Sequence, residues 1–209
     1  MIAPTGIGTS RLEAFSDGVL AILITIMAFQ ILPPDGGALR DLGDVGPAVA
    51  AFALSFVFLG IYWNNHHHLL RATEHIDGAV MWANLGLLFF LTLIPPATAW
   101  LGDQHGEPGP AVIYGLVCFA SALAYTALVR AILRANPTSR IVEAIGNDRK
   151  GIVSLVLYAT GAAVSAVVPY AGIALYLVVS IVWLVPDRRI AHVVPAVPAP
   201  AGAEGTDRD

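Results

Sequence analysis

The hydrophobic residues of this chain lie in long continuous runs that are separated by short polar segments. A helix needs about 20 predominantly apolar residues to cross a bilayer, because each residue advances the helix by about 1.5 Å. Six runs approach this length, and they predict six transmembrane helices. The runs cover residues 14–32, 47–70, 79–101, 110–133, 151–168 and 170–185.

The segments between the runs contain residues that are typical of turns. Two prolines follow the first run, and Asn136 with a proline follows the fourth. Only Pro169 separates the fifth run from the sixth, which predicts a tight helical hairpin there. We expect residues 1–192 to form one six-helix transmembrane domain. We expect residues 193–209, which are rich in Ala, Pro and Gly, to form a disordered tail.

Two other interpretations of the apolar runs fit poorly. A cleaved secretory signal is disfavoured because Glu13 and Asp17 lie near the start of the first run, and no small-residue cleavage pattern ends it. The strands of a β-barrel alternate in polarity over about ten residues, whereas these runs are continuously apolar. The pattern therefore predicts an all-α integral membrane protein with a retained first helix.

Composition supports a membrane protein. The chain is 56% hydrophobic and only 12% charged, whereas soluble domains are about 25% charged. A formal net charge of -4 offers no basic surface for nucleic acid. The one cysteine, Cys118, allows neither an intrachain disulfide nor a cysteine-based zinc site. These numbers argue against a soluble enzyme and against a nucleic-acid-binding protein.

Basic residues are distributed very unevenly between the two sides of such a bundle. If both termini are cytoplasmic, the outer loops carry Arg40 and the inner segments carry the other ten of the 11 Lys and Arg residues. Cytoplasmic loops of membrane proteins carry an excess of Lys and Arg. We therefore predict cytoplasmic N and C termini.

The centres of all six runs lack Asp, Glu, Lys and Arg. The ionisable residues nearest to a centre are Asp17, one turn into the first run, and Arg130, one turn before the end of the fourth. A transporter coupled to protons or sodium generally needs a titratable or ion-binding group within the membrane. A small-solute or ion secondary transporter is therefore the alternative rather than the preferred hypothesis.

Three consecutive histidines, His66, His67 and His68, lie at the end of the second run. Adjacent helical residues point about 100° apart, so these rings cannot converge on one metal ion from one helix. A structural polar network is favoured, while a pH-sensitive element, metal binding and a histidine-dependent membrane enzyme stay open. Trp63 is either an interfacial anchor or part of the same network, because it lies three and four residues before His66 and His67. We expect no enzyme and no metal site.

The first run begins with a dense polar cluster and continues with a one-sided stripe. The stripe has the i, i+3, i+4, i+7 spacing of a single helix face, which a lipid-facing or core face would also show. The cluster is compatible with a helix cap in which Arg11 pairs with Asp17. The cluster consists of Arg11, Phe15, Ser16 and Asp17, and the stripe of Ile22, Thr25, Ile26 and Phe29.

The first helix resembles a known signature. Arg11-x-x-x-Phe15-Ser16-Asp17-Gly18, followed by Ala21-Ile22 and Thr25, is similar to the first helix of the transmembrane protein 175 family, the bacterial relatives of the lysosomal potassium leak channel. The resemblance extends over the first three runs. It continues with Trp63-x-x-His66-His67, with Asn84, and with Pro95-Pro96-Ala97-Thr98.

This resemblance implies a homotetrameric, potassium-permeable cation channel of the bacterial inner membrane, with one six-helix repeat in each chain and a modest preference for potassium over sodium. It implies no carbonyl selectivity filter and no cofactor, and as partners the lipid bilayer and monovalent cations. The first helix would line the pore, with Ile22 as the main constriction and Thr25, Ile26 and Phe29 continuing outward. Gln30 and the bulky Phe29 depart from the family pattern at the outer end. The structural network would comprise Arg11, Phe15, Ser16, Asp17, Trp63, His66, His67 and Asn84.

Overall fold

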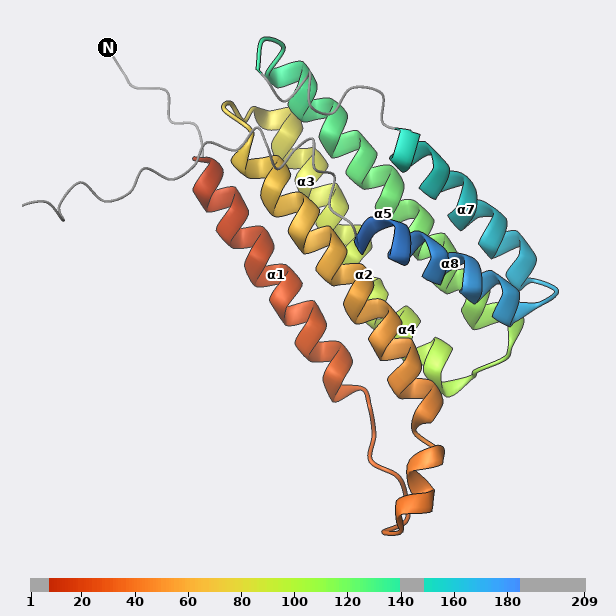
Figure 1. Ribbon diagram of the computed structural model, residues 1–209. Helices are drawn as coiled ribbons and strands as arrows, with labels where there is room; N and C mark the ends of the chain where they lie inside the picture. The colour runs from red at the N-terminus through yellow and green to blue at the C-terminus, as the bar shows by residue number, and fades with distance from the viewer. Residues whose placement is uncertain (1–7, 140–148, 185–209) are drawn as a thin grey trace, which may run out of the picture.

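The computed structural model describes residues 8–139 and 149–184, and every regular element in these ranges is helical. The tail predicted for residues 193–209 and the end of the sixth run lie outside the described residues. The elements are α1 (Thr9–Phe29), the short 3-10 helix η1 (Leu39–Gly43), α2 (Gly46–Arg71), α3 (Gly78–Leu91), α4 (Ile94–Asp103), α5 (Pro108–Ala135), α7 (Arg149–Ser165) and α8 (Pro169–Leu184) (Figure 1).

Four segments are long and apolar enough to cross a membrane. They have 21, 26, 26 and 28 residues and match the first four predicted runs. The helices α7 and α8 are also apolar, but at 17 and 16 residues they are shorter than the roughly 20 that a perpendicular span requires. The protein is thus a multi-pass helical membrane protein. The four segments are Thr9–Phe29, Gly46–Arg71, Gly78–Asp103 and Pro108–Ala135.

The third span is divided into two helices. The sequence predicted a single run over 79–101, but α3 ends at Leu91 and α4 begins at Ile94. Pro95 and Pro96 have no backbone N–H group, so they cannot bond the carbonyls one turn earlier that a continuous helix would pair. The prolines therefore interrupt the helix while the apolar segment continues through the interruption.

Glycines allow the α7–α8 hairpin to pack closely, both within itself and against α5. The Tyr176 hydroxyl donates a 3.1 Å hydrogen bond to the Ala111 carbonyl of α5. A Cβ atom at Gly115 of α5 would overlap the Tyr176 side chain, and one at Gly172 would overlap the Ser165 hydroxyl within the hairpin. The structure confirms the hairpin predicted from Pro169. Because Gly115 and Gly172 have no Cβ atom, the helices can approach one another this closely.

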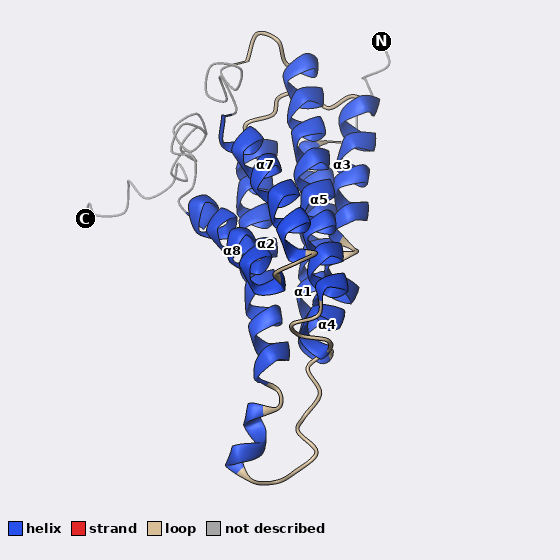
Figure 2. Ribbon diagram, turned by 90° about the vertical axis from the view of Figure 1, so that its right-hand side faces the viewer, coloured by secondary structure: helices blue, strands red, loops and turns tan. Residues whose placement is uncertain are grey.

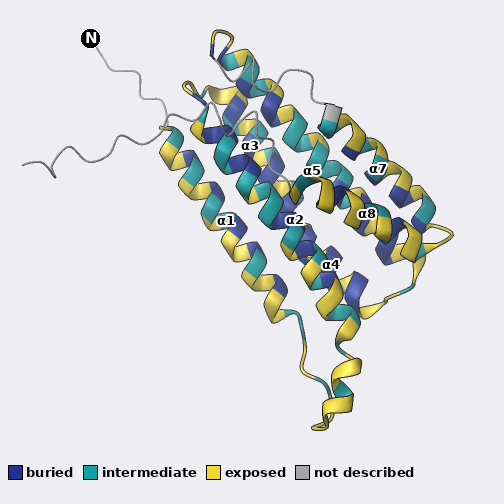
Figure 3. Cartoon of the chain, viewed as in Figure 1, coloured by how far each residue is buried: buried dark blue, intermediate teal, exposed yellow. Residues whose placement is uncertain are grey.

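The first helix lies at the edge of the bundle (Figure 1). It packs against α2, α3 and α4, and its remaining surface is exposed in the single chain (Figure 3). The segment that joins α1 to α2, including η1, extends beyond the end of the bundle (Figure 2). This placement leaves one long side of α1 free to contact something other than its own chain.

The bundle places most described basic residues at one end. Arg11 lies near the start of α1, Arg71 at the end of α2, Arg134 in the last turn of α5 and Lys150 at the start of α7. Arg40 lies in η1, at the opposite end (Figures 1 and 2). The fold therefore reproduces, in space, the charge asymmetry from which the sequence predicted the orientation.

Candidate functional site

The two faces of α1 differ sharply in burial. One face packs into the bundle, with buried residues recurring every three or four positions. The other face carries the predicted pore stripe and is exposed, with Ile22 at 58% and Phe29 at 85%. Thr25 and Ile26 are exposed on the same side. The buried residues are Leu12, Ser16, Leu20, Leu23 and Met27.

Thr25 keeps its hydroxyl proton inside the helix. Its Oγ1 donates to the Ile22 carbonyl at 2.8 Å and also lies 3.2 Å from the Ala21 carbonyl. A threonine hydroxyl has one proton and two acceptor lone pairs. Because the proton is used within α1, the exposed oxygen offers lone pairs to its surroundings. Thr25 therefore presents an acceptor, suited to a cation, in the middle of the apolar stripe.

A buried hydrogen-bonded chain joins α1, α2 and α3 near the start of α1. Asn84 donates from Nδ2 to Ser16 Oγ at 3.0 Å, and its Oδ1 accepts from His66 Nε2 at 2.7 Å. Ser16 in turn donates to the Leu12 carbonyl at 2.9 Å. All three side chains are at most 1% exposed. The structure thus brings together three of the residues that the sequence placed in a structural network.

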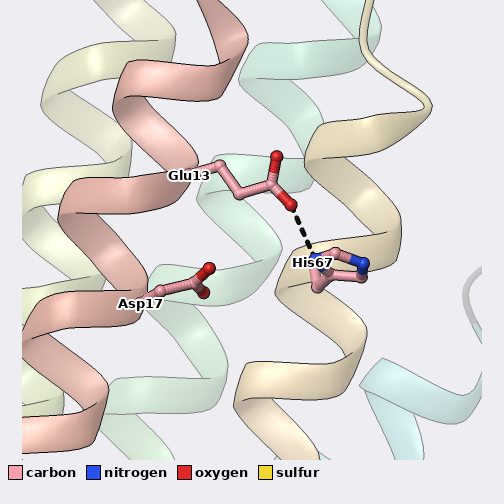
Figure 4. Close-up of side chains that lie close together, drawn as sticks. All are labelled: Glu13, Asp17 and His67. Atoms are coloured by element: carbon pink, nitrogen blue, oxygen red, sulfur yellow. Dashed lines mark ion pairs between the residues drawn. The ribbon is translucent and has the colours of Figure 1, made fainter.

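A second contact joins α1 to α2 beside this chain. His67 Nδ1 lies 2.6 Å from Glu13 Oε1, which is an ion-pair contact when the ring is protonated (Figure 4). The indole ring of Trp63 stacks on the His67 ring at 6.0 Å between centroids and 24° between planes. Asp17 lies next to this pair, and its buried Oδ1 has no hydrogen-bond partner.

The three histidines diverge, as the helical spacing predicted. His66 faces Asn84 of α3, and His67 faces Glu13 of α1. The His68 ring makes an edge contact with the His67 ring, at 5.6 Å between centroids and 68° between planes. The geometry therefore gives each histidine a separate environment.

Sequence reasoning missed Glu13 as a partner of His67. Glu13 lies four residues before Asp17, on the same face of α1, so helical spacing could have identified it. Conversely, Arg11 and Phe15 are exposed, and among the described residues no ion pair joins Arg11 to Asp17 within the chain. These two members of the polar cluster point away from the network that the single chain forms.

Ser55, Thr98 and Tyr114 form a further buried polar cluster, and the sequence did not predict that these three side chains meet. Ser55 Oγ lies 2.7 Å from Thr98 Oγ1 and 2.9 Å from the Tyr114 hydroxyl. These hydrogen bonds connect α2 with α4 and α5, on the α4 side of the break in the third span. Single hydroxyl residues in apolar runs have no diagnostic spacing, so only the packed structure shows that they meet.

The first helix of this apolar bundle therefore leaves a continuous stripe unpaired in the single chain and is anchored by a buried hydrogen-bonded chain on its other face. The family profile described as "Endosomal/lysosomal potassium channel TMEM175" matches residues 11–95. The chain belongs to the TMEM175 family. This confirms the resemblance carried by the first helix and indicates a channel rather than an enzyme.

Similar proteins extend this assignment over most of the chain. A potassium channel from Chryseobacterium sp. is 45% identical over 181 residues, covering 86% of this chain and 94% of that protein. The endosomal/lysosomal proton channel TMEM175 of Mus musculus is 28% identical over 167 residues, covering 71% of this chain and 34% of the mouse protein. The crystal structure of a lysosomal potassium-selective channel TMEM175 homolog from Chamaesiphon minutus superimposes with a TM-score of 0.76 at 28% identity, covering 86% of this chain and 97% of that one.

Proposed function

We propose that this protein is a potassium-permeable cation channel with modest preference for potassium over sodium, and that α1 lines its pore in a homotetramer. The observation that carries the proposal is the exposed stripe on α1, whose opposite face is fixed in the bundle. The names of its relatives, a potassium channel from Chryseobacterium sp. and a potassium-selective homolog from Chamaesiphon minutus, support the choice of ion.

Four copies of the chain around a common axis would bring four α1 stripes face to face. Ile22 would form the main constriction, with Thr25, Ile26 and Phe29 continuing the lining outward. A narrow ring of aliphatic side chains expels water, and an ion cannot pass without its hydration shell. Small tilts of α1 that widen the ring would rewet and open the pore. Each chain would contribute one six-span unit, with α7 and α8 tilted or embedded at the side of the bundle.

Modest selectivity follows from the groups available in such a pore. The chain has no Thr-Val-Gly-Tyr-Gly segment, so it cannot form the conventional ring of carbonyl oxygens that replaces the hydration shell of a potassium ion. The Thr25 hydroxyls are the polar groups on the stripe, and they accept without needing to donate outward. They would favour the ion that loses water more easily, which is potassium. Gln30 in place of an acid and the bulky Phe29 would weaken recruitment of cations at the outer end.

The polar residues near the start of α1 would set the position of the pore helix. Ser16, His66 and Asn84 form a buried chain across three helices, and His67, stacked on Trp63, contacts the same helix. Arg11, Phe15 and Asp17 would complete this network, with the exposed Arg11 and Phe15 contacting a neighbouring subunit. We infer that this end faces the cytoplasm of a bacterium and that the channel resides in the inner membrane.

Planar-bilayer recording of the purified protein under bi-ionic potassium and sodium tests the proposal. A channel conducts passively and follows the applied voltage, and a preference for potassium displaces the reversal potential from zero toward the potassium equilibrium. A secondary transporter, the alternative, would carry charge only with a counter-substrate. Absence of passive cation current, or a current carried by chloride, would overturn the proposal.

A further inference from the structure

We propose that a groove between α2 and α8 binds one acyl chain of a phospholipid whose headgroup carries a primary amine. The two helices start at the same end of the bundle, and α8 is inclined to α2 (Figures 1 and 2). Near their ends they enclose, with α5, a space of about 40 Å³. Near their starts they diverge and leave a groove of about 690 Å³, a volume typical of ligand sites. Lipid binding there does not depend on ion conduction.

The walls of the groove are apolar helix faces. Ala50, Ala53 and Leu54 line it on α2, and Ile173 and Leu177 line it on α8. Ala50 and Ala53 are exposed, and their small side chains give the groove its depth. Because α2 is one of the segments long and apolar enough to cross a membrane, its exposed surface faces hydrocarbon. A hydrocarbon chain is therefore the ligand that this surface fits.

The groove is about as long as one leaflet of a bilayer is thick. Its lining residues on α2 extend from Gly46 to Val57, which is about 16 Å at about 1.5 Å per residue. The hydrocarbon core of a bilayer is about 30 Å thick, so one leaflet contributes about 15 Å. The groove also begins at the first residue of α2, where the span enters the membrane. This length matches one extended acyl chain, whereas a neighbouring transmembrane helix would need contact along the whole span.

The polar side chains that line the groove, His105 and Tyr170, lie together at the end where α2 begins. The Tyr170 hydroxyl lies 3.0 Å from the position that a Cβ atom of Gly106 would occupy, and Gly106 has a φ of 86°, which favours glycine. The ring of Tyr170 can therefore reach from α8 to the loop between α4 and α5. Tyrosine is typical of the headgroup level, because its ring is apolar and its hydroxyl forms hydrogen bonds. His105 and Tyr170 can donate to the phosphate or ester oxygens of a lipid.

The charges at this end of the groove favour a headgroup with a positive group. Asp44 precedes the first lining residue of α2 by two positions, and Asp103 and Glu107 lie in the loop segment that carries the other end of the lining; all three are exposed. Arg40, a basic residue at this end, has its Nε 3.6 Å from Asp41 Oδ1. The ammonium of an ethanolamine headgroup is attracted by such a surface, and a headgroup with a net negative charge is repelled.

Photo-crosslinking of the purified, delipidated full-length protein tests the site. The probe is a phosphatidylethanolamine with a diazirine in one acyl chain, and mass spectrometry of the peptides locates the label. We expect label on residues 46–57 of α2 and 170–177 of α8. Label spread equally over all exposed helix faces would overturn the site. This readout uses the wild type, so it decides the question even if a variant fails to fold.

A variant that fills the groove gives a second measurement. Ala53→Phe should weaken the Kd for phosphatidylethanolamine, followed by native mass spectrometry, by about tenfold. Ala163→Phe is the matched control, because Ala163 is an exposed alanine on α7 outside the groove, and it should leave the Kd unchanged. Equal Kd values in the two variants would overturn the site. If a second copy of the chain occupied the groove, Ala53→Phe would break up the oligomer without affecting lipid binding, which would also overturn the proposal.

The headgroup is tested with the wild type and two lipids that share the same acyl chains. Phosphatidylethanolamine should bind about fivefold more tightly than phosphatidylglycerol, since one charge near a charged surface contributes about this factor. Glu107→Gln should reduce this ratio. Equal or tighter binding of phosphatidylglycerol by the wild type would overturn the preference for an amine. None of these readouts needs ion flux, so failure of the lipid site and failure of the proposed channel function are distinguishable.

Discussion

The side-chain amide of Asn84 donates a 3.0 Å hydrogen bond to Ser16 Oγ, and so joins α3 to α1 across 68 positions of sequence. The same amide group accepts from His66 on α2. Asn84 is thus the centre of a fully buried chain that holds the outermost helix to two neighbours. In a low-dielectric interior such hydrogen bonds strengthen one another, so loss of one member affects the rest.

Replacing Ser16 with Ala should destabilise the protein by about 1–3 kcal/mol, because the buried Asn84 amide would lose its acceptor. Thermal unfolding in detergent measures this change. Ser121→Ala is the matched control, since Ser121 is equally buried but its hydroxyl donates to the Val117 carbonyl of its own helix. If the two substitutions lower the stability equally, the hydrogen bond between Ser16 and Asn84 does not stabilise the protein beyond the loss of a buried hydroxyl.

Replacing Ile22 with Asn should raise passive cation flux in liposomes, since a polar ring holds water in the constriction and removes the dewetting barrier. The control is Ile181→Asn on α8, where the isoleucine is 55% exposed and thus comparable to Ile22 at 58%. That substitution should leave flux at the wild-type level. Unchanged flux in Ile22→Asn would show that Ile22 does not form the constriction.

Replacing Thr25 with Val keeps the shape of the side chain but removes the acceptor oxygen from the α1 stripe. We expect the preference for potassium over sodium to fall, with the bi-ionic reversal potential moving toward zero. Thr126→Val is the control, because its hydroxyl also bonds a carbonyl of its own helix, Ala122 at 2.9 Å, but lies on α5. An unaltered reversal potential in Thr25→Val would show that selectivity arises elsewhere.

Replacing Gly115 with Ala should destabilise the bundle by about 1–3 kcal/mol, because the new methyl group would overlap Tyr176 and force the α7–α8 hairpin away from α5. Gly60→Ala provides the comparison. No neighbouring atom lies within 4 Å of a Cβ at Gly60, and alanine is the better helix former by about 1 kcal/mol. We expect the midpoint of thermal unfolding to fall in Gly115→Ala and to stay equal or rise in Gly60→Ala. The reverse order would contradict the packing described for the hairpin.

Much of the fold could be predicted from local properties of the chain. Continuous apolar runs identify spans because a bilayer leaves backbone groups no partners except those within a helix. The first four runs, the hairpin at Pro169 and the charge asymmetry between the two ends all appear in the structure as predicted. Pro95 and Pro96 also encode the break in the third span locally. A prediction based only on hydrophobicity does not detect this break, because the residues on both sides of it are apolar.

The candidate site was also predictable from the sequence only in part. The helical spacing of Ile22, Thr25, Ile26 and Phe29 established that these residues share a face of the first helix. It could not show which way the face points, because a lipid-facing, core or pore-facing stripe has the same period. Packing of the opposite face against α2, α3 and α4 decided that the stripe is the exposed one.

By itself, therefore, the sequence determined the apolar helical segments and the residues that share each helix face, since these depend on neighbours a few positions apart. Only the tertiary structure decided which polar groups meet. Glu13 with His67, Ser16 with Asn84, and Ser55 with Thr98 are contacts between different helices. Their partners lie tens of residues apart in the sequence, so only the packing of whole helices can bring them within bonding distance.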